Sequence, residues 1–160
     1  MDDMGILRTT IAVESHTRRG ALVELADTMV DTGSEYTWVP RTVLEQLGIG
    51  PERIEHFVTA DGRVLAREVG FAIVHAAGAR TSDDVVFAQE GDMTLLGAHT
   101  IEGMNLRVDL KQRRLVPAGP VPAAIGIGDA QNGERSNGGR RLLRRTDVPP
   151  ASTYAPNPHA

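Results

Sequence analysis

The chain has 160 residues, of which 41% are apolar and 24% are charged, and its formal net charge is −4. These values are typical of one folded domain with tails, and we expect no nucleic-acid partner. The absence of Cys excludes disulfides and thiolate metal sites. The N-terminus is acidic without an apolar signal segment, and no stretch reaches the ~20 apolar residues of a membrane span, so we expect a cytoplasmic protein without a membrane partner.

The first predicted elements are strands that lead to Asp31. Residues 8–14 are rich in β-branched side chains and predict an opening strand. Residues 21–25 predict a second strand, Ala26-Asp27 a tight connection, and residues 28–31 the return strand of a hairpin. Asp31 is therefore expected at the end of a hairpin arm.

A short helix and a second hairpin are predicted next. Residues 35–39 predict a strand, after which Pro40 begins a helical pattern that Gly48 ends. Three apolar residues share one face of this helix: Val43, Leu44 and Leu47. Residues 57–65 predict two strands around an Asp61-Gly62 turn, a dipeptide typical of hairpins.

The rest of the pattern consists mostly of strands. Alternating or apolar runs predict strands at residues 68–75, 84–88, 105–110 and 114–116. In residues 93–101, the apolar pair Leu95-Leu96 and Gly97 precede a short helical segment. The expected fold is all-β with one or two short helices, in a domain that covers residues 1–117.

The end of the chain differs from this domain in composition. Residues 1–120 carry 18 acidic and 12 basic side chains, a net charge of −6, whereas residues 121–160 carry 3 acidic and 5 basic ones, a net charge of +2. Because five Gly and five Pro fall in the last 40 residues, we predict a largely disordered tail over residues 118–160. Its basic cluster at residues 140–145 could contact an acidic surface, a nucleic acid or a membrane, and a solubilising or processed tail is the favoured interpretation.

The most informative motif is Asp31-Thr32-Gly33-Ser34, which places one carboxylate in a tight turn. Two carboxylates that face one water are the requirement of aspartic protease chemistry, and Gly lets two backbones approach each other. The chain contains one such motif, so a complete site requires a second copy of the chain. The motif therefore predicts a symmetric dimer together with the enzyme.

The surroundings of this motif resemble the single-domain retroviral-type aspartic proteases and their bacterial relatives. The resemblance covers residues 20–117 and rests on three ordered elements: the Asp31 motif with residues 36–40 and the helix that ends at Leu47-Gly48, the hairpin at residues 57–65, and Leu95-Leu96-Gly97 before a helix. It implies a closed acid-protease half-barrel with a flap hairpin, assembled as a symmetric homodimer. It also implies an endopeptidase whose partners are its own second copy and a peptide or protein substrate.

The resemblance assigns a role to each matching residue. Asp31 and its copy would activate a water, with no metal or organic cofactor. Thr32 would bond across the dimer axis, Gly33 would let the two turns approach, and terminal strands would build the interface. The hairpin tip, Ala60, Asp61 and Gly62, would be the flap, and Leu95-Leu96-Gly97 would pack beside the active-site loop.

Two further expectations concern chemistry near Asp31. The Ser34 hydroxyl can donate a hydrogen bond to the ionised carboxylate, which predicts an activity optimum shifted toward acid. Apolar residues near the motif and the hairpin suggest a cleft for extended apolar peptide segments: Val30, Ile54, Val64 and Leu96. Trp38 and Phe57 are interpreted as core residues, with the cleft as the alternative.

Other functions are less favoured. The five His residues lack the i, i+4 spacing of a zinc site, and no Gly-x-Ser-x-Gly motif supports a serine hydrolase. An Asp-Thr-Gly sequence can also simply form a loop, as Asp27 and Asp61 are expected to do. The remaining alternative is a catalytically silent dimeric module that binds peptides, in which the carboxylate of Asp31 would be dispensable.

Overall fold

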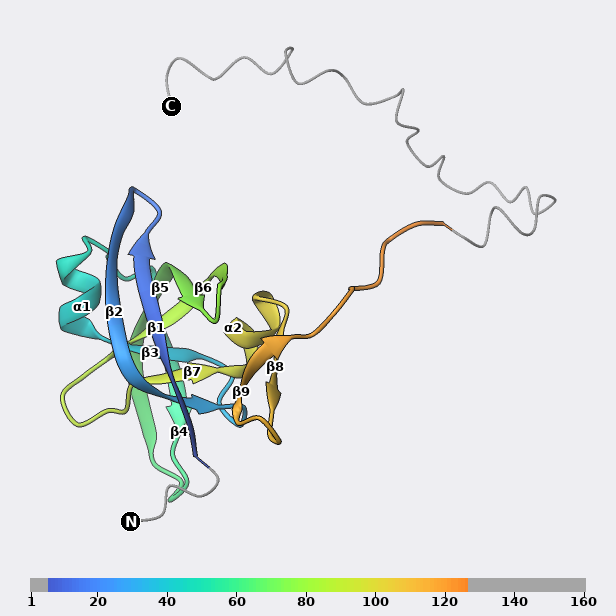
Figure 1. The fold of residues 1–160 in the computed structure, drawn as a ribbon. Helices are drawn as coiled ribbons and strands as arrows, with labels where there is room; N and C mark the ends of the chain where they lie inside the picture. The colour runs from blue at the N-terminus through green and yellow to red at the C-terminus, as the bar shows by residue number, and fades with distance from the viewer. Residues whose placement is uncertain (1–5, 127–160) are drawn as a thin grey trace, which may run out of the picture. The chain divides into compact units, whose positions relative to one another are not determined.

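The structure, a computed structural model, describes residues 6–126 (Figure 1). Within that range the chain forms nine strands and two six-residue helices. The strands are β1 Leu7–Ser15, β2 Arg18–Asp31, β3 Thr37–Pro40, β4 Arg53–Val58, β5 Val64–Ala76, β6 Ala79–Ala88, β7 Leu95–Gly97, β8 Leu106–Asp109 and β9 Arg114–Pro117. The helices are α1 Arg41–Gln46 and α2 Ala98–Gly103. The all-β prediction with two short helices is confirmed.

Seven of these strands form one sheet that closes on itself. The strand order is β1-β2-β7-β3-β6-β5-β4, and β1 also pairs with β5, which converts the sheet into a barrel. Alternate residues of each strand point inward, so the barrel interior is the hydrophobic core. The largest fully buried side chains in this core are Ile11, Leu44, Phe87 and Leu96. β8 and β9 form a separate two-stranded sheet.

The strand that ends at Asp31 corrects one prediction. β2 is a single strand of 14 residues that pairs antiparallel with β1 along its length, so no tight connection occurs at Ala26-Asp27. The pairing instead slips by one residue there, since Thr9 faces Thr28 whereas Ile11 faces Leu25. Asp27 adopts a positive φ of 53° in this bulge, a conformation that Asp tolerates better than most residues. The sequence signal for a turn therefore marks a β-bulge.

The helix after β3 forms as predicted. Pro40 lies at the end of β3 and immediately precedes the first residue of α1. Leu44 and Leu47 are buried against the barrel, and Gly48 ends the helical segment with a φ of +73° that suits glycine. Both leucines belong to the hydrophobic core, so the segment packs against β3 and β6.

A buried charge lies outside the hydrophobic core, on Glu14 of β1. Its side chain is 3% exposed, and its carboxylate accepts hydrogen bonds from the Gly20 amide at 2.9 Å and from His75 Nε2 at 2.7 Å. The Gly20 bond, followed by the His75 bond, lowers the pKa of Glu14 to about 2. The carboxylate is thus held in its ionised form inside the β1–β2–β5 corner.

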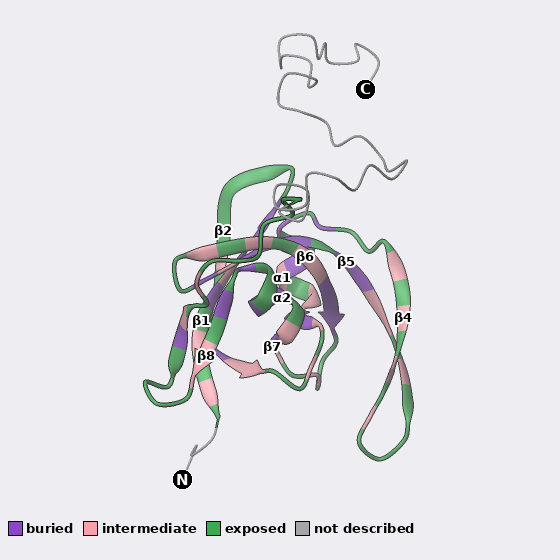
Figure 2. Cartoon of the chain, turned by 90° about the vertical axis from the view of Figure 1, so that its right-hand side faces the viewer, coloured by how far each residue is buried: buried purple, intermediate pink, exposed green. Residues whose placement is uncertain are grey.

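The β4–β5 hairpin extends beyond the barrel. The two strands pair antiparallel from Arg53↔Val69 to Val58↔Val64, which leaves residues 59–63 as the loop. Figure 2 shows this tip as mostly exposed, in contrast with the second half of β5, which is largely buried. The predicted hairpin is confirmed, with a five-residue loop around Asp61-Gly62. Among residues 6–126, no helix is long and apolar enough to cross a membrane.

Residues 127–160 contain most of the predicted tail, including its basic cluster, and lie outside the described residues. The tail prediction therefore stays a prediction.

Candidate active site

Asp31 is the last residue of β2, and its neighbour across the sheet is β7. The short β7 strand lies between β2 and β3, parallel to β2 and antiparallel to β3. Asp31 is in register with Gly97 in this parallel pair. The half-buried Asp31 thus stands where the end of β2 meets β7, a segment distant in sequence.

One oxygen of the Asp31 carboxylate is held by its own turn. The Gly33 amide donates to Oδ1 at 2.9 Å, and the Ser34 amide donates to the Asp31 carbonyl at 3.2 Å. A Cβ on Gly33 would lie 3.2 Å from Oδ1, so glycine allows the backbone to curl closely around the carboxylate. The other oxygen, Oδ2, has no hydrogen-bond partner among residues 6–126 and is available to an outside group.

The Ser34 hydroxyl does not have the role that the sequence suggested. It donates to the Tyr36 carbonyl at 3.0 Å, and a hydroxyl has a single proton to donate. The expectation that Ser34 donates to the Asp31 carboxylate is wrong in this structure. The reason is that the turn directs residue 34 toward the following strand, where its hydroxyl stabilises the loop instead.

The segment at the end of β7 packs against the same loop. A Cβ on Gly97 would lie 2.3 Å from the Tyr36 carbonyl oxygen, so only glycine allows this approach. The next two amides continue the contact, because Ala98 N–H donates to Ser34 O at 2.7 Å and His99 N–H donates to Glu35 O at 3.1 Å. Leu95, Leu96 and Gly97 are all buried there.

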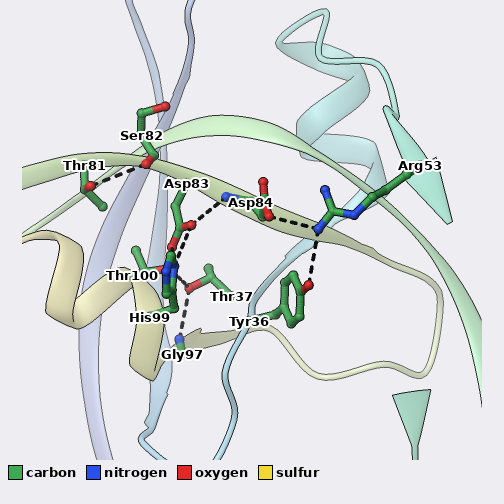
Figure 3. Close-up of polar contacts among 10 residues, drawn as sticks. All are labelled: Tyr36, Thr37, Arg53, Thr81, Ser82, Asp83, Asp84, Gly97, His99 and Thr100. Atoms are coloured by element: carbon green, nitrogen blue, oxygen red, sulfur yellow. Dashed lines mark hydrogen bonds and ion pairs between the residues drawn. The ribbon is translucent and has the colours of Figure 1, made fainter. Parts of the chain in front are cut away.

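A network of polar side chains lies behind this contact (Figure 3), and it was not predicted from the sequence. Gly97 N–H donates to Thr37 Oγ1 at 3.0 Å, and Thr37 Oγ1 lies 2.6 Å from Thr100 Oγ1. Thr100 Oγ1 donates to Asp83 Oδ2 at 2.9 Å. His99 Nδ1 lies 2.9 Å from Asp83 Oδ1, and this hydrogen bond raises the pKa of His99 above its usual 6.5. No signal in the sequence indicated this role of Asp83, because the strand predicted there begins at residue 84.

The hairpin tip is held mainly by its own residues. Thr59 N–H donates to Arg63 O at 2.8 Å, and Gly62 N–H donates to Thr59 O at 2.9 Å. The Thr59 hydroxyl donates a hydrogen bond to the Asp61 carboxylate. This bond is the main cause of the lowered pKa of Asp61, and Arg63 contributes less. Within residues 6–126 no hydrogen bond joins the tip, including Ala60, to the Asp31 turn. The structure thus does not bring these two predicted groups into contact within one chain.

The candidate cleft residues fall in three different environments. Ile54 and Val64 are exposed on the hairpin, at 62% and 61%, and Val30 is half-buried next to Asp31. Leu96 is fully buried in the core, so its assignment to a substrate cleft is corrected. Its position in a central strand, flanked on both sides by β2 and β3, explains the burial.

Aromatic contacts connect the outer part of the hairpin to β3 and to Tyr36, the residue before it. Phe57 lies 5.0 Å from the Trp38 ring and 5.5 Å from the Tyr36 ring, measured between centroids. Arg53 donates to the Tyr36 hydroxyl at 3.2 Å and pairs with Asp84 at 2.9 Å. All three aromatic rings are half-buried, so they anchor the hairpin and still present some surface.

The structure also contains a pocket of about 440 Å³ beside α2, lined by Glu35, Tyr36, Asp83, Asp84, Ala98, His99 and Glu102. Asp31 is not among its lining residues. Within residues 6–126, no group of three or more His, Asp or Glu side chains is placed to hold a metal ion.

Comparisons with known proteins add a limited similarity. No protein-family model matches the chain, and no curated protein matches it. Among solved structures, the solution structure of Simian Foamy Virus (mac) protease is similar, with 18% identity over 59% of this chain and 91% of that chain, at a TM-score of 0.42. A similarity at this level does not indicate an activity for this chain.

Proposed function

We propose that this chain is an aspartic endopeptidase of the single-domain retroviral type, active as a homodimer through Asp31 of each copy. The observation that carries the proposal is the state of the Asp31 carboxylate. Its Oδ1 is fixed by the Gly33 amide at 2.9 Å, whereas Oδ2 has no partner within residues 6–126. A carboxylate that is oriented by one oxygen and free at the other suits a base that must bind a water.

A second copy is required by the chemistry. Peptide hydrolysis by this route needs one carboxylate as base and one as acid, and the chain provides one carboxylate in such a turn. Two copies related by a two-fold axis would place the two Asp31 side chains together. Because two close carboxylates cannot both be ionised, the pair would hold one proton and so provide both roles.

The reaction then follows without a covalent intermediate. The ionised Asp31 accepts a proton from the water as the water oxygen forms a bond to the peptide carbonyl carbon. The protonated Asp31 of the second copy donates to the carbonyl oxygen, which gives a tetrahedral diol. When the carbon–nitrogen bond breaks, the nitrogen takes the proton held by the first Asp31. A hydroxyl of the diol gives its proton to the Asp31 of the second copy as the product carboxyl group forms, so one proton again remains on the two carboxylates.

Neighbouring residues have supporting roles in this proposal. The exposed Thr32 hydroxyl has no hydrogen-bond partner within residues 6–126, which leaves it free to bond across the two-fold axis. The hairpin tip at Ala60, Asp61 and Gly62 would close over the substrate and exclude water. Ile54 and Val64 expose apolar surface on that hairpin, which favours extended apolar peptides.

The test is cleavage of a complex peptide mixture, read by mass spectrometry from pH 4 to 7. The wild type is compared with Asp31→Asn and with the matched control Asp27→Asn. Asp27 lies in the β2 bulge at φ 53°, which Asn also tolerates, so the same charge is removed four residues away. We expect the wild type and Asp27→Asn to cut the same bonds and Asp31→Asn to cut none.

Two outcomes would contradict the proposal. Cuts that persist in Asp31→Asn would assign the activity to other residues. A wild type that binds peptides as a dimer but cleaves none at any pH would instead support the catalytically silent binding module.

A further inference from the structure

A buried chain of hydrogen bonds connects the neighbour of Asp31 to a carboxylate on another strand. It runs from the Gly97 amide through the hydroxyls of Thr37 and Thr100 to Asp83 of β6. Thr37 and Thr100 are both 0% exposed, and the Asp83 side chain is 8% exposed. Figure 3 shows these side chains converging between β3, β6 and the start of α2. The two threonines therefore lie inside the protein, and Asp83 at the end of the path borders the pocket beside α2.

The direction of every bond in this chain is determined. Thr100 has one hydroxyl proton, and Asp83 Oδ2 receives it at 2.9 Å. Thr37 must then donate to Thr100, across 2.6 Å, because Thr100 has no second proton to give. Thr37 Oγ1 in turn accepts from the Gly97 amide at 3.0 Å. All donors point toward Asp83, an arrangement in which successive bonds polarise one another.

Asp83 ends the chain as a carboxylate with three different donors. Besides the Thr100 hydroxyl, its Oδ1 accepts from the Asp84 amide at 2.8 Å and lies 2.9 Å from His99 Nδ1. A neutral amide in its place has one acceptor oxygen and two N–H donors, so it cannot satisfy all three donors in this geometry. The network thus requires Asp at this position.

We propose that Asp83, acting through Thr100 and Thr37, is a positioning residue that fixes the Gly97 peptide beside Asp31. This inference rests on the proposed function for its catalytic consequence. Gly97 is in register with Asp31, and the loop from Ser34 to Tyr36 is packed against the Gly97–His99 segment. A shift of Gly97 therefore moves the Asp31 turn. A carboxylate that must meet its copy across a dimer axis tolerates little displacement, so the network controls turnover more than substrate binding.

The test breaks the chain at its middle. Thr100→Val keeps the side-chain shape and removes the hydroxyl, whereas Thr100→Ser keeps the hydroxyl. Amide exchange of Gly97 and Gly33, measured by NMR, shows how firmly the turn is held in place, and this measurement requires no enzymatic activity. We expect Thr100→Val to speed exchange of both amides about tenfold, since the Thr37 hydroxyl loses its acceptor. Thr100→Ser should stay within about threefold of the wild type.

Peptide cleavage gives the second readout. Thr100→Val should lower kcat by roughly ten- to a hundred-fold and leave KM within about threefold. A second pair of variants covers the case in which Thr100→Val does not fold. Asp83→Asn should also lower kcat, by a smaller factor than Thr100→Val. Asp84→Asn is its matched control, because Asp84 pairs with Arg53 and not with Thr100.

The outcomes separate this inference from the proposed function. A folded Thr100→Val with wild-type exchange and wild-type kcat would overturn the positioning role, as would equal losses in Asp83→Asn and Asp84→Asn. If the wild type cleaves no peptide, the proposed function fails, and the exchange of Gly97 and Gly33 still decides the positioning role alone.

Discussion

The Asp31 turn and the tip of the β4–β5 hairpin both connect strand segments, yet they are held in different ways. The turn bonds to its own carboxylate and, through the carbonyls of Ser34 and Glu35, to the β7–α2 segment, which is distant in sequence; Tyr36 packs against Gly97 there. The tip at residues 59–63 bonds mainly to itself. In the proposed enzyme, the group that does the chemistry is thus fixed by long-range packing, and the segment that covers the substrate is fixed only locally.

This contrast has an energetic meaning. Regions with many buried long-range contacts open only with the whole domain, whereas regions with local bonds open at small cost. The Asp31 turn belongs to the first kind, and the hairpin tip belongs to the second. Hydrolysis in a closed site requires a rigidly held catalytic carboxylate and a segment that can open and close over the substrate.

The largest expected effect comes from breaking the contact behind the turn. Gly97→Ala would place a Cβ 2.3 Å from the Tyr36 carbonyl oxygen, so β7 must move away from the loop. We expect a loss of about 3 kcal/mol or more in the free energy of unfolding, measured by urea denaturation. Gly50→Ala is the control, because a Cβ there meets nothing within 4 Å. Equal, small losses in both variants would show that the contact behind the turn is loose.

The next effect concerns the middle of the hairpin, where an ion pair joins β5 to the loop before β7 in addition to the Arg53–Asp84 pair. Arg67 of β5 binds both oxygens of Asp92, at 2.7 and 2.9 Å, and the two side chains are 13% and 14% exposed. Arg67→Met should cost about 2 kcal/mol of stability, since a buried charge-assisted pair is lost. The substitution should also speed amide exchange in β4 and β5 more than amide exchange near Asp31. Exchange that rises first near Asp31 would contradict the separation of the two regions.

A smaller effect is expected at the tip itself. Gly62 has a φ of +85°, and a Cβ there meets nothing within 4 Å, so only backbone strain opposes a side chain. Gly62→Ala should cost about 1 kcal/mol, confined to local opening of the hairpin. The measurement is amide exchange of residues 59–63 compared with that of Gly33. A change at Gly33 as large as that at the tip would mean that the two regions open together.

The smallest effect is a pH dependence next to the turn. The Asp83 carboxylate raises the pKa of His99 above 6.5, so folding favours the protonated imidazole. This contribution to stability is fully present below pH 6.5 and is lost as the pH rises through the raised value. His99→Gln should therefore flatten the stability profile above pH 6.5. Because the His99 side chain is 75% exposed, solvent keeps the effect small. A profile identical to that of the wild type would remove His99 from the electrostatics of the turn.

Features of the fold that depend on residues close in sequence were predicted correctly, whereas features that depend on distant residues were not. Pro40 and Gly48 bound the first helix correctly, and Asp61-Gly62 identified the hairpin, because those signals act within a few residues. The connection expected at Ala26-Asp27 was wrong because a β-bulge and a turn use the same residue types. Local patterns cannot separate them without the partner strand.

The candidate site likewise has a part that could be predicted from the sequence and a part that could not. The turn around Asp31 follows from Gly33, a neighbour in sequence. The Thr37–Thr100 bond joins residues 63 positions apart, and buried threonines resemble ordinary strand and helix residues in a single sequence. Leu96 was misplaced because the insertion of β7 between β2 and β3 buries it, and only the topology reveals that insertion.

The central claim is that Asp31 of two copies forms one site, and mixing of subunits tests it most directly. Wild type is mixed with an equal amount of Asp31→Asn, at concentrations where the chain is dimeric by light scattering, and peptide cleavage is measured after exchange. Mixed dimers have one carboxylate and should be inactive, so we predict that cleavage falls to about half that of the same amount of wild type alone. Unchanged cleavage in fully exchanged dimers would show that each copy works alone and would contradict the account.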